Sequence, residues 1–324
     1  MTVSNFVLSL TSYGPRFKFL FQTFQGIKRQ SLQPTIIQLN IDITEKNNYL
    51  KYHEKLSQIF DFQVNYMENL GPGKKLIPAI EHYPDYCIVT VDDDLQFDDQ
   101  LFLELWKNHE KEPSAIIATR WHKPRFLPCG YLAPYEEWEF DSDQMSISDH
   151  PFVTAGSGAL FPPSSLAIEV LDRKKYLDLS FSTDDVWYWY HAILNQTPVI
   201  RIEGFSELKY TKYSQENTLY WDGNSAVFND LNIRSLAINL GLFQCKIGCH
   251  TNSIPELLNQ INSNTNGTAM VKRILPLTKS LSSKERYMII RDLTQLEKSR
   301  SRYMEISRSN YKLVKQLVKN IIQR

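Results

Sequence analysis

The chain has 324 residues, of which 42% are hydrophobic and 22% charged, values that argue against global disorder and against a fibrous repeat. Its 36 Lys and Arg residues balance its 36 Asp and Glu residues, so the net charge does not indicate a nucleic-acid partner. Positive and negative charges are unevenly distributed along the chain. Residues 268–324 carry 14 basic and 4 acidic side chains, a net charge of +10, which leaves −10 on residues 1–267.

Targeting signals and disulfides are not expected. The first residues lack a basic segment followed by an apolar run, so they do not resemble a signal peptide, and no apolar run is long enough to span a membrane. Cys245, Cys249 and His250 form a cluster, but the spacing of the remaining residues offers no clear fourth zinc ligand, and reduced thiols are the preferred interpretation. We expect a cytoplasmic protein, and we leave open a peripheral position on the cytoplasmic face of the inner membrane.

Short apolar runs alternate with amphipathic segments from the amino terminus onward. The runs predict strands, and the helical spacing of apolar residues predicts helices between and after them. The expected strands are 5–10, 35–41, 62–67, 86–91 and 116–119, and the expected helices are 16–30, 45–60, 75–82, 164–171, 184–195 and 228–240. This alternation predicts an α/β fold with a mostly parallel sheet flanked by helices.

The composition changes near residue 250. The polar segment 262–268 (NSNTNGT) is typical of a linker, and the following residues combine Lys and Arg with apolar residues at helical spacing. We therefore predict a globular domain of residues 1–250, a linker of residues 251–267 and a basic helical extension of residues 268–324. Such an extension is typical of a membrane-surface anchor, and a helical hairpin or coiled coil packed on the domain or on a second copy is the alternative.

Three consecutive aspartates follow the expected strand 86–91. Asp92, Asp93 and Asp94 would lie at the carboxyl end of a buried strand, where open α/β sheets bind their ligands. Their hard oxygens suit Mg²⁺ or Mn²⁺, which also coordinate diphosphate oxygens. A solvated acidic turn is the alternative.

A second acidic pair, Asp184 and Asp185, begins the expected helix 184–195. Carboxylates in a first helical turn are favoured by the helix dipole, and this would explain the pair without any chemistry. The functional alternative is a general base in a cleft, with Trp187 as an apolar wall.

Basic residues also occur where strands end. Arg16, Lys74 and Lys75 follow the first and third expected strands and could complement a diphosphate. No glycine-rich phosphate-binding loop of the nucleoside triphosphatase or dinucleotide-binding type is present, which disfavours both of those classes.

Several ordered blocks resemble a known family. The segments SLTSYGPRF (9–17), GPGKKLIPAIEHYPD (71–85) and IVTVDDDLQF (88–97) are similar to bacterial GT-A-fold glycosyltransferases of capsular polysaccharide and lipopolysaccharide biosynthesis, which are like glycosyltransferase family 2. The blocks at 154–166, 182–199 and 229–243 follow in the same order. The resemblance covers about residues 5–243 and excludes the basic extension.

The resemblance implies metal-dependent transfer of a sugar, with inversion, from a nucleotide sugar to a hydroxyl of a glycan or lipid-linked glycan. A UDP-sugar is the expected donor. Asp94 and Asp92 would hold Mn²⁺ or Mg²⁺, and Asp185, or with lower preference Asp184, would be the catalytic base. The remaining implied site residues are Thr11, Tyr13, Arg16, Lys74, Asp92 and Asp93 for the donor, and Gly156, Ser157, Gly158 and Trp187 for the acceptor and sugar.

Two other hypotheses belong to different classes. A nucleotide-sugar- or carbohydrate-binding protein without turnover would keep the fold but not the chemistry. A nucleotidyltransferase would release pyrophosphate from a triphosphate, and it ranks lower because no glycine-rich triphosphate loop follows the first strand. No nucleic-acid partner is expected, and homo-oligomerisation is left open.

Overall fold

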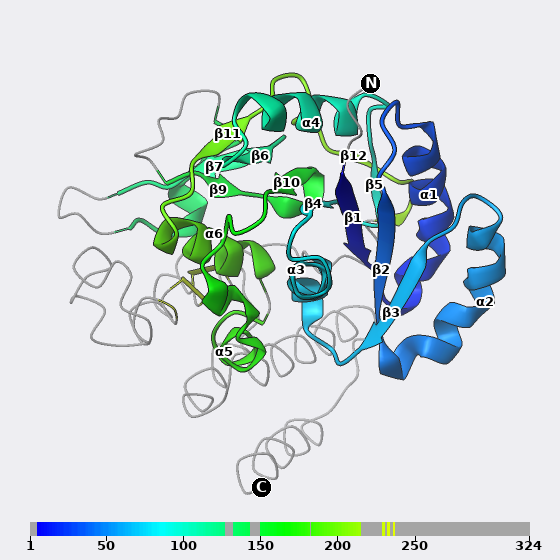
Figure 1. Ribbon diagram of the computed structural model, residues 1–324. Coiled ribbons are helices and arrows are strands. Elements are labelled where there is room, and N and C mark those ends of the chain that lie inside the picture. The colour runs from blue at the N-terminus through cyan, green and yellow to red at the C-terminus, as the bar shows by residue number, and fades with distance from the viewer. Residues whose placement is uncertain are drawn as a thin grey trace, which may run out of the picture. The chain divides into compact units, whose positions relative to one another are not determined.

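The computed structural model describes residues 5–126, 132–142, 150–181 and 183–214, together with Asn229, Asp230, Asn232, Ile233 and Leu236 (Figure 1). The chain divides into two compact units, Met1–His250 and Thr251–Arg324, and every described residue belongs to the first. The linker and the basic extension lie outside the described residues, so the expected domain boundaries stay predictions. No helix of the described ranges has the length and apolar character needed to cross a membrane.

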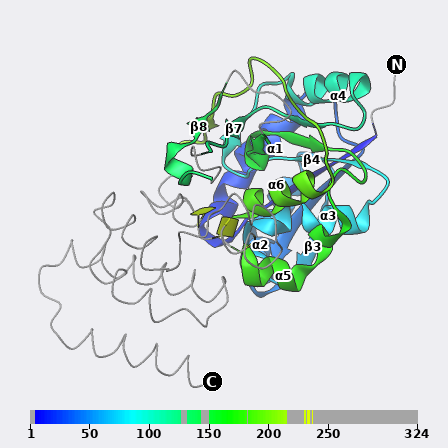
Figure 2. The same ribbon diagram turned by 90° about the vertical axis from the view of Figure 1, so that its left-hand side faces the viewer.

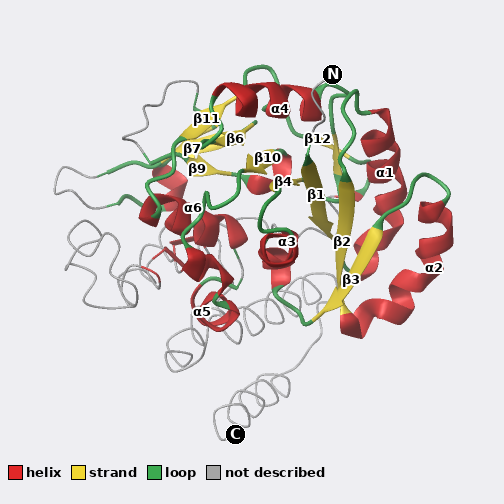
Figure 3. Cartoon of the chain, in the orientation of Figure 1, coloured by secondary structure: helices red, strands yellow, loops and turns green. Residues whose placement is uncertain are grey.

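A seven-stranded sheet forms the centre of the described unit, in the order β11-β6-β10-β4-β1-β2-β3 (Figure 3). Neighbouring strands are parallel except β10, which is antiparallel to both β4 and β6. The expected α/β class with a mostly parallel sheet is therefore confirmed. The strands are β1 (Phe6–Thr11), β2 (Ile36–Asp42), β3 (Gln63–Met67), β4 (Cys87–Thr90), β6 (Ile116–Ala118), β10 (Ala159–Phe161) and β11 (Val199–Arg201).

Two small antiparallel sheets and a set of helices surround the central sheet (Figures 1 and 2). The first small sheet pairs β5 (Leu95–Gln96) with β12 (Lys209–Tyr210), and the second joins β7 (Trp121–Lys123), β8 (Glu139–Phe140) and β9 (Phe152–Val153). The helices are α1 (Leu20–Arg29), α2 (Lys46–Ser57), α3 (Ile77–His82), α4 (Leu101–Lys111), α5 (Arg173–Leu179) and α6 (Asp184–Leu194). The 3₁₀ helices are η1 (Gly14–Phe19), η2 (Ile43–Glu45), η3 (Gly71–Lys75), η4 (Tyr135–Glu137), η6 (Ala155–Ser157) and η7 (Ile168–Leu171).

Alternation along the strands divides the core between the two faces of the sheet. In β1, Phe6, Leu8 and Leu10 belong to the cluster that includes α1, α2 and α4, whereas Val7 belongs to the cluster of α3 and α6. The same alternation puts Ser9 on the α3 and α6 face. Polar side chains of the strands thus face the loops in which η3 and η6 lie.

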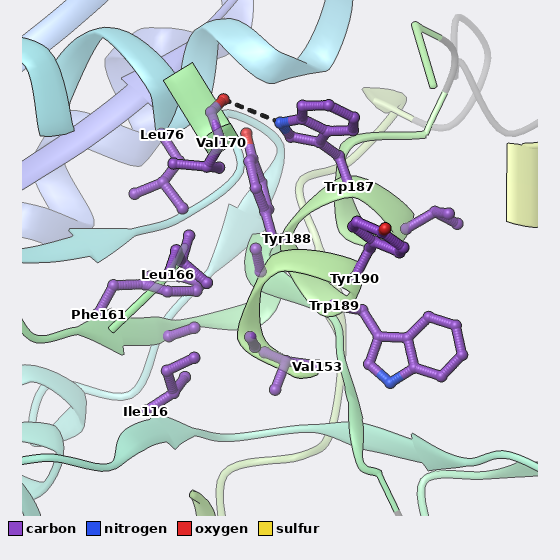
Figure 4. Close-up of a cluster of buried hydrophobic side chains, with 14 of the residues drawn as sticks. Leu76, Ile116, Val153, Phe161, Leu166, Val170, Trp187, Tyr188, Trp189 and Tyr190 are labelled. Carbon is purple, nitrogen blue, oxygen red and sulfur yellow. Dashed lines mark hydrogen bonds between the residues drawn. The ribbon is translucent and has the colours of Figure 1, made fainter. Parts of the chain in front are cut away.

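Helix α6 is almost entirely buried, and all four of its aromatic residues at 187–190 pack into the core (Figure 4). The Trp187 indole is fully buried and donates a hydrogen bond from Nε1 to the Val170 carbonyl at 2.9 Å. It also packs edge-on against Tyr176. Trp187 therefore stabilises the core and its indole is not presented to a ligand, so we do not retain it in the proposed acceptor site.

Most expected elements occur within two or three residues of the predicted bounds, and the differences are informative. The helix expected at 164–171 is correct only in part: Ser164 has a positive φ of 58°, and helical structure within this range is limited to the 3₁₀ helix η7. The α-helix begins only at Arg173, where Asp172 accepts a hydrogen bond from the Lys175 amide at 2.9 Å. The expected helix 16–30 begins as the 3₁₀ helix η1, which starts at Gly14 and has Pro15 in its first turn. Most of the expected helix 228–240 lies outside the described residues.

Candidate functional site

Two buried hydroxyl groups of the sheet fix the loops that surround the candidate site. Ser9 of β1 and Thr90 of β4 are paired neighbours, and both are fully buried. The Ser9 hydroxyl donates to the Lys75 carbonyl at 2.6 Å, and the Thr90 hydroxyl donates to the Ala155 carbonyl at 2.8 Å. The end of η3 and the turn at 154–158 are thereby attached to adjacent strands.

The aspartate triplet follows β4, as the sequence predicts. The Asp92 amide donates to the Gly156 carbonyl at 2.8 Å, which joins the triplet to the same turn. The Asp92 side chain is 38% exposed, whereas those of Asp93 and Asp94 are only 4% and 7% exposed. Asp92 is therefore the carboxylate of the triplet that a ligand can reach most easily.

Arg16, in η1, neutralises part of the triplet. Its guanidinium forms ion pairs with the Asp93 carboxylate and, at 2.8 Å, with Asp94 Oδ1. Burial, followed by the charge of Asp92, still raises the pKa of Asp94 to about 6. One guanidinium thus does not compensate the whole triplet.

Lys75 is the second buried cation of the site. Its Nζ lies 2.6 Å from Asp92 Oδ1 and 3.6 Å from Asp184 Oδ2, and its side chain is only 6% exposed. Burial alone would lower the pKa of this ammonium, but the carboxylates of Asp184 and Asp92 raise it above its ordinary value. Lys75 therefore remains charged between the two acidic motifs.

The acidic pair at the start of α6 faces the site. Asp185 Oδ1 accepts a hydrogen bond from the Ala155 amide at 3.0 Å, and burial together with the adjacent Asp184 raises the Asp185 pKa to about 8. The preceding Thr183 makes no capping hydrogen bond with its side chain. These contacts go beyond an interaction with the helix dipole, which was the alternative explanation of the pair.

The turn that contains η6 requires glycine at position 156. A Cβ atom on Gly156 would overlap with the Asp92 carboxylate, far inside van der Waals contact. Gly158 has a φ of 118°, and the Ser157 hydroxyl donates to the Thr154 carbonyl at 3.0 Å. The three residues predicted for the sugar and acceptor loop therefore form one compact turn against the triplet.

Three residues predicted for the donor site contact groups other than the acidic side chains of the site. The Thr11 hydroxyl donates to the Asn40 carbonyl at 2.8 Å, and the Tyr13 ring lies 5.8 Å from the Arg16 guanidinium carbon. The Lys74 ammonium donates to Asn69 Oδ1 at 3.0 Å and to the Gly71 carbonyl at 2.8 Å, both in its own loop. The donor roles of these three residues stay predictions.

The charge balance of the site fits a divalent cation. In the part of the chain that the structure describes, two cations, Arg16 and Lys75, form ion pairs in a site that holds five carboxylates, those of Asp92, Asp93, Asp94, Asp184 and Asp185. Within the described ranges, no three Asp, Glu, His or Cys side chains converge to hold a metal ion by themselves. Mg²⁺ is commonly held by one or two carboxylates plus substrate phosphates, and Asp92 and Asp94 match that donor set.

Two residues of the described positions 229–236 make contacts that the sequence does not reveal, and one of them, Asn232, contacts the residue before the acidic pair. The Asn232 amide donates to the Thr183 hydroxyl at 2.6 Å, directly before Asp184. Asp230 accepts a hydrogen bond from the Tyr135 amide at 2.8 Å, and burial raises its pKa to about 7. Both residues lie in the expected helix 228–240, and the structure connects this segment to the start of α6 through Asn232.

Comparisons with known proteins give distant structural likenesses. No family model and no curated protein matches the chain. The structure of S. aureus TarS 1–349 in complex with UDP-GlcNAc has a TM-score of 0.46 at 11% identity, over 90% of this chain and 92% of that chain. The 4-diphosphocytidyl-2C-methyl-D-erythritol synthase from Anaerococcus prevotii has a TM-score of 0.39 at 13% identity, over 71% and 96%. Likenesses of this degree do not establish an activity, so a functional conclusion has to rest on the site itself.

Proposed function

We propose that the protein is a glycosyltransferase that transfers a sugar from a nucleotide sugar, expected to be a UDP-sugar, to a glycan hydroxyl. The observation that carries the proposal is the position of Asp185, which is hydrogen-bonded to the turn that contacts Asp92. One carboxylate motif at the end of β4 and another at the start of α6 are thus brought to the two sides of a single turn. This is the arrangement that the sequence resemblance implies for a donor site next to a base.

The chemistry follows from the two motifs. Asp185 has the raised pKa expected of a base that works near neutral pH, and it would remove the proton from the acceptor hydroxyl as that oxygen attacks the anomeric carbon. Attack on the face opposite the leaving diphosphate inverts the configuration at that carbon. Asp92 and Asp94 would hold Mn²⁺ or Mg²⁺, which neutralises charge on a diphosphate leaving group.

The acceptor we propose is a growing or lipid-linked surface glycan, of the capsular or lipopolysaccharide type. This proposal is supported by the ordered sequence blocks and not by a contact in the structure. It is consistent with action on the cytoplasmic face of a membrane, where lipid-linked acceptors are available.

The test is titration of the protein with a panel of nucleotide sugars, with and without Mn²⁺, followed by measurement of nucleoside diphosphate release after addition of acceptor glycans. We expect one donor to bind in a metal-dependent manner and Asp94→Ala to abolish that binding. Asp178→Asn is a matched control, because Asp178 is an exposed carboxylate on α5 that belongs to neither acidic motif.

Three results would redirect the proposal. Binding without release of nucleoside diphosphate under any acceptor condition would indicate the binding protein without turnover. Release of pyrophosphate from a nucleoside triphosphate would indicate a nucleotidyltransferase. Failure to bind any nucleotide under any metal condition would contradict the proposal as a whole.

A further inference from the structure

We propose that Lys75 is a positioning residue that holds the donor-binding carboxylate Asp92 and the start of α6 in one fixed arrangement. The proposal rests on the proposed function, because it concerns how the two halves of that site are kept together. It also reassigns this lysine: its ammonium serves as an internal counter-ion of the protein and not as a ligand of the diphosphate.

The contacts of Lys75 join segments that are far apart in the chain. Its ammonium lies between Asp92, which follows β4, and Asp184, which begins α6. The two carboxylates are far apart in the sequence, so only the fold brings them together. Because both contact the same buried ammonium, a displacement of α6 relative to β4 would break at least one ion pair.

The backbone of Lys75 is hydrogen-bonded to a side chain of the central sheet. Its carbonyl accepts a hydrogen bond from Ser9, and the Ser9 hydroxyl itself accepts one from the Asn40 amide at 3.1 Å. All three residues are buried. The root of the side chain is therefore fixed relative to β1 and β2.

Two tyrosines hold the same loop from the other side. The Gly73 amide donates to the Tyr176 hydroxyl at 2.9 Å, and the Tyr188 hydroxyl donates to the Gly73 carbonyl at 3.4 Å. A Cβ atom on Gly73 would lie 2.5 Å from Tyr176 Cζ, so the ring packs directly on the loop backbone. This packing explains why Gly73 is needed, and it fixes the loop backbone two residues before Lys75.

The adjacent lysine provides a comparison. Lys74 and Lys75 are both almost fully buried, but the Lys74 ammonium contacts Asn69 and Gly71 of its own loop. The Lys75 ammonium contacts Asp92 and Asp184, one carboxylate from each acidic motif. Because a displacement of about 1 Å between reacting groups can reduce a rate about 100-fold, a residue that fixes their separation is expected to act mainly on kcat.

The experiment compares Lys75→Met, Lys75→Arg and the surface control Lys107→Met in the full chain, with donor Kd, KM and kcat measured separately. Lys107 forms an exposed ion pair with Glu104 on α4. We expect Lys75→Met to lower kcat about 100-fold while the donor Kd changes much less, and Lys75→Arg to recover a substantial part of kcat. A Lys75→Met variant with normal kcat, or one that loses donor affinity while kcat at saturating donor is preserved, would overturn the inference.

A double variant keeps the test decisive if Lys75→Met alone fails to fold. Lys75→Met combined with Asp184→Asn removes one buried charge of each sign, so the net charge of the site is unchanged and only Asp92 loses an ion pair. If Lys75→Met does not fold, the double variant is compared with Asp184→Asn alone, and we expect the two to have similar kcat. If Lys75→Met folds, we expect the effects on kcat to be non-additive, with the double variant no worse than the more impaired single variant. If the two effects multiply, Lys75 does not act through Asp184. Absence of turnover in the unmodified protein would instead contradict the proposed function.

Discussion

The surroundings of Asp185 favour its protonated form on balance, although the Lys75 ammonium and the Ala155 amide favour the ionised form. Burial is the largest cause and the neighbouring Asp184 the next, and together they raise its pKa to about 8. An ordinary carboxyl group titrates near pH 4, a value of about 3.9 for aspartate. A carboxylate with such a raised pKa is a stronger base at neutral pH, at the cost of being ionised in only a fraction of the molecules.

The first prediction concerns the pH dependence of turnover. Because the base must be ionised, kcat/KM should rise about tenfold per pH unit below about pH 8 and level off above it. Initial rates from about pH 6 to about pH 9.5 with a fixed donor and acceptor would measure this. Asp185→Asn should reduce kcat by about 100-fold to 10,000-fold without shifting the donor Kd. A profile that is flat over this range, as expected for a base with the ordinary carboxyl pKa of about 4, would contradict the assignment of Asp185 as a base with a raised pKa.

The same raised pKa has a consequence for stability. The native Asp185 carboxyl retains a proton up to about pH 8, whereas the unfolded chain releases it near pH 4, so the stabilisation is complete below about pH 4 and is lost as the pH rises to about 8. The contribution of Asp185 to the free energy of unfolding of the metal-free protein should therefore fall between about pH 6.5 and about pH 8. Urea unfolding at several pH values would show a shallower fall in Asp185→Asn. Parallel curves for both proteins would contradict this reasoning.

The residue types of the site could be predicted from sequence, but their pairing could not. Asp92, Asp94 and Asp185 stand out because charged residues interrupt strongly apolar segments. Lys74 and Lys75 could not be separated, because the direction of each side chain depends on the 3₁₀ geometry of η3 and on the Ser9 hydroxyl that fixes it. Trp187 was assigned to the acceptor site from its position near the acidic pair, and the helical rotation places it in the core instead.

At the scale of elements, the site depends on a tight approach between the turn at 154–158 and the end of β4. Gly156 makes this approach possible, since a Cβ atom there would overlap with Asp92 Oδ2. A methyl group has to displace the carboxylate, the turn or both. The result is a site whose geometry is sensitive to one methyl group.

Gly156→Ala should therefore lower both donor affinity and kcat by at least about tenfold, because it moves Asp92. Isothermal titration with the donor and initial-rate measurements would determine the two effects. Gly26→Ala is the control: Gly26 lies within α1, and a methyl group there would meet only Arg29 Nη2, at 3.9 Å. The control should keep activity and gain about 0.5–1 kcal/mol in stability, as expected for alanine in a helix. Normal donor binding by Gly156→Ala would show that the turn adjusts freely.

Strands and helices with clear periodicity could be predicted closely, and those without it could not. β1, β2, β3 and β4 occur within one or two residues of the expected bounds, because each is an apolar run between turn residues. β10 is only three residues long, and its sequence does not reveal that it enters the sheet antiparallel between β4 and β6. That pairing is decided by contacts between segments that lie far apart in the chain.

At the scale of the whole molecule, the opposite charges of the two parts of the sequence lead to a prediction about location. The extension 268–324, with a net charge of +10, lies outside the described residues, so this expectation comes from its sequence. The full chain should sediment with vesicles that contain anionic lipid at low salt and should be released as salt is raised. A chain without residues 268–324 should lose vesicle binding and keep donor binding. Equal sedimentation of both chains would contradict a membrane role for the extension.

The position of the antiparallel strand β10 also has a consequence for folding during synthesis, because the central sheet cannot be completed until β10 has been made. Strands β1 to β4 are synthesised first, and they can pair with one another at once. Strand β6 is synthesised before β10, although β10 lies between β6 and β4 in the finished sheet. Until Phe161 has emerged, at about 5–20 residues per second, β4 is an edge strand with unpaired backbone groups. The nascent chain thus passes through an interval in which the sheet has an unpaired edge at the strand that the three aspartates follow, and in that interval the edge can pair with other chains.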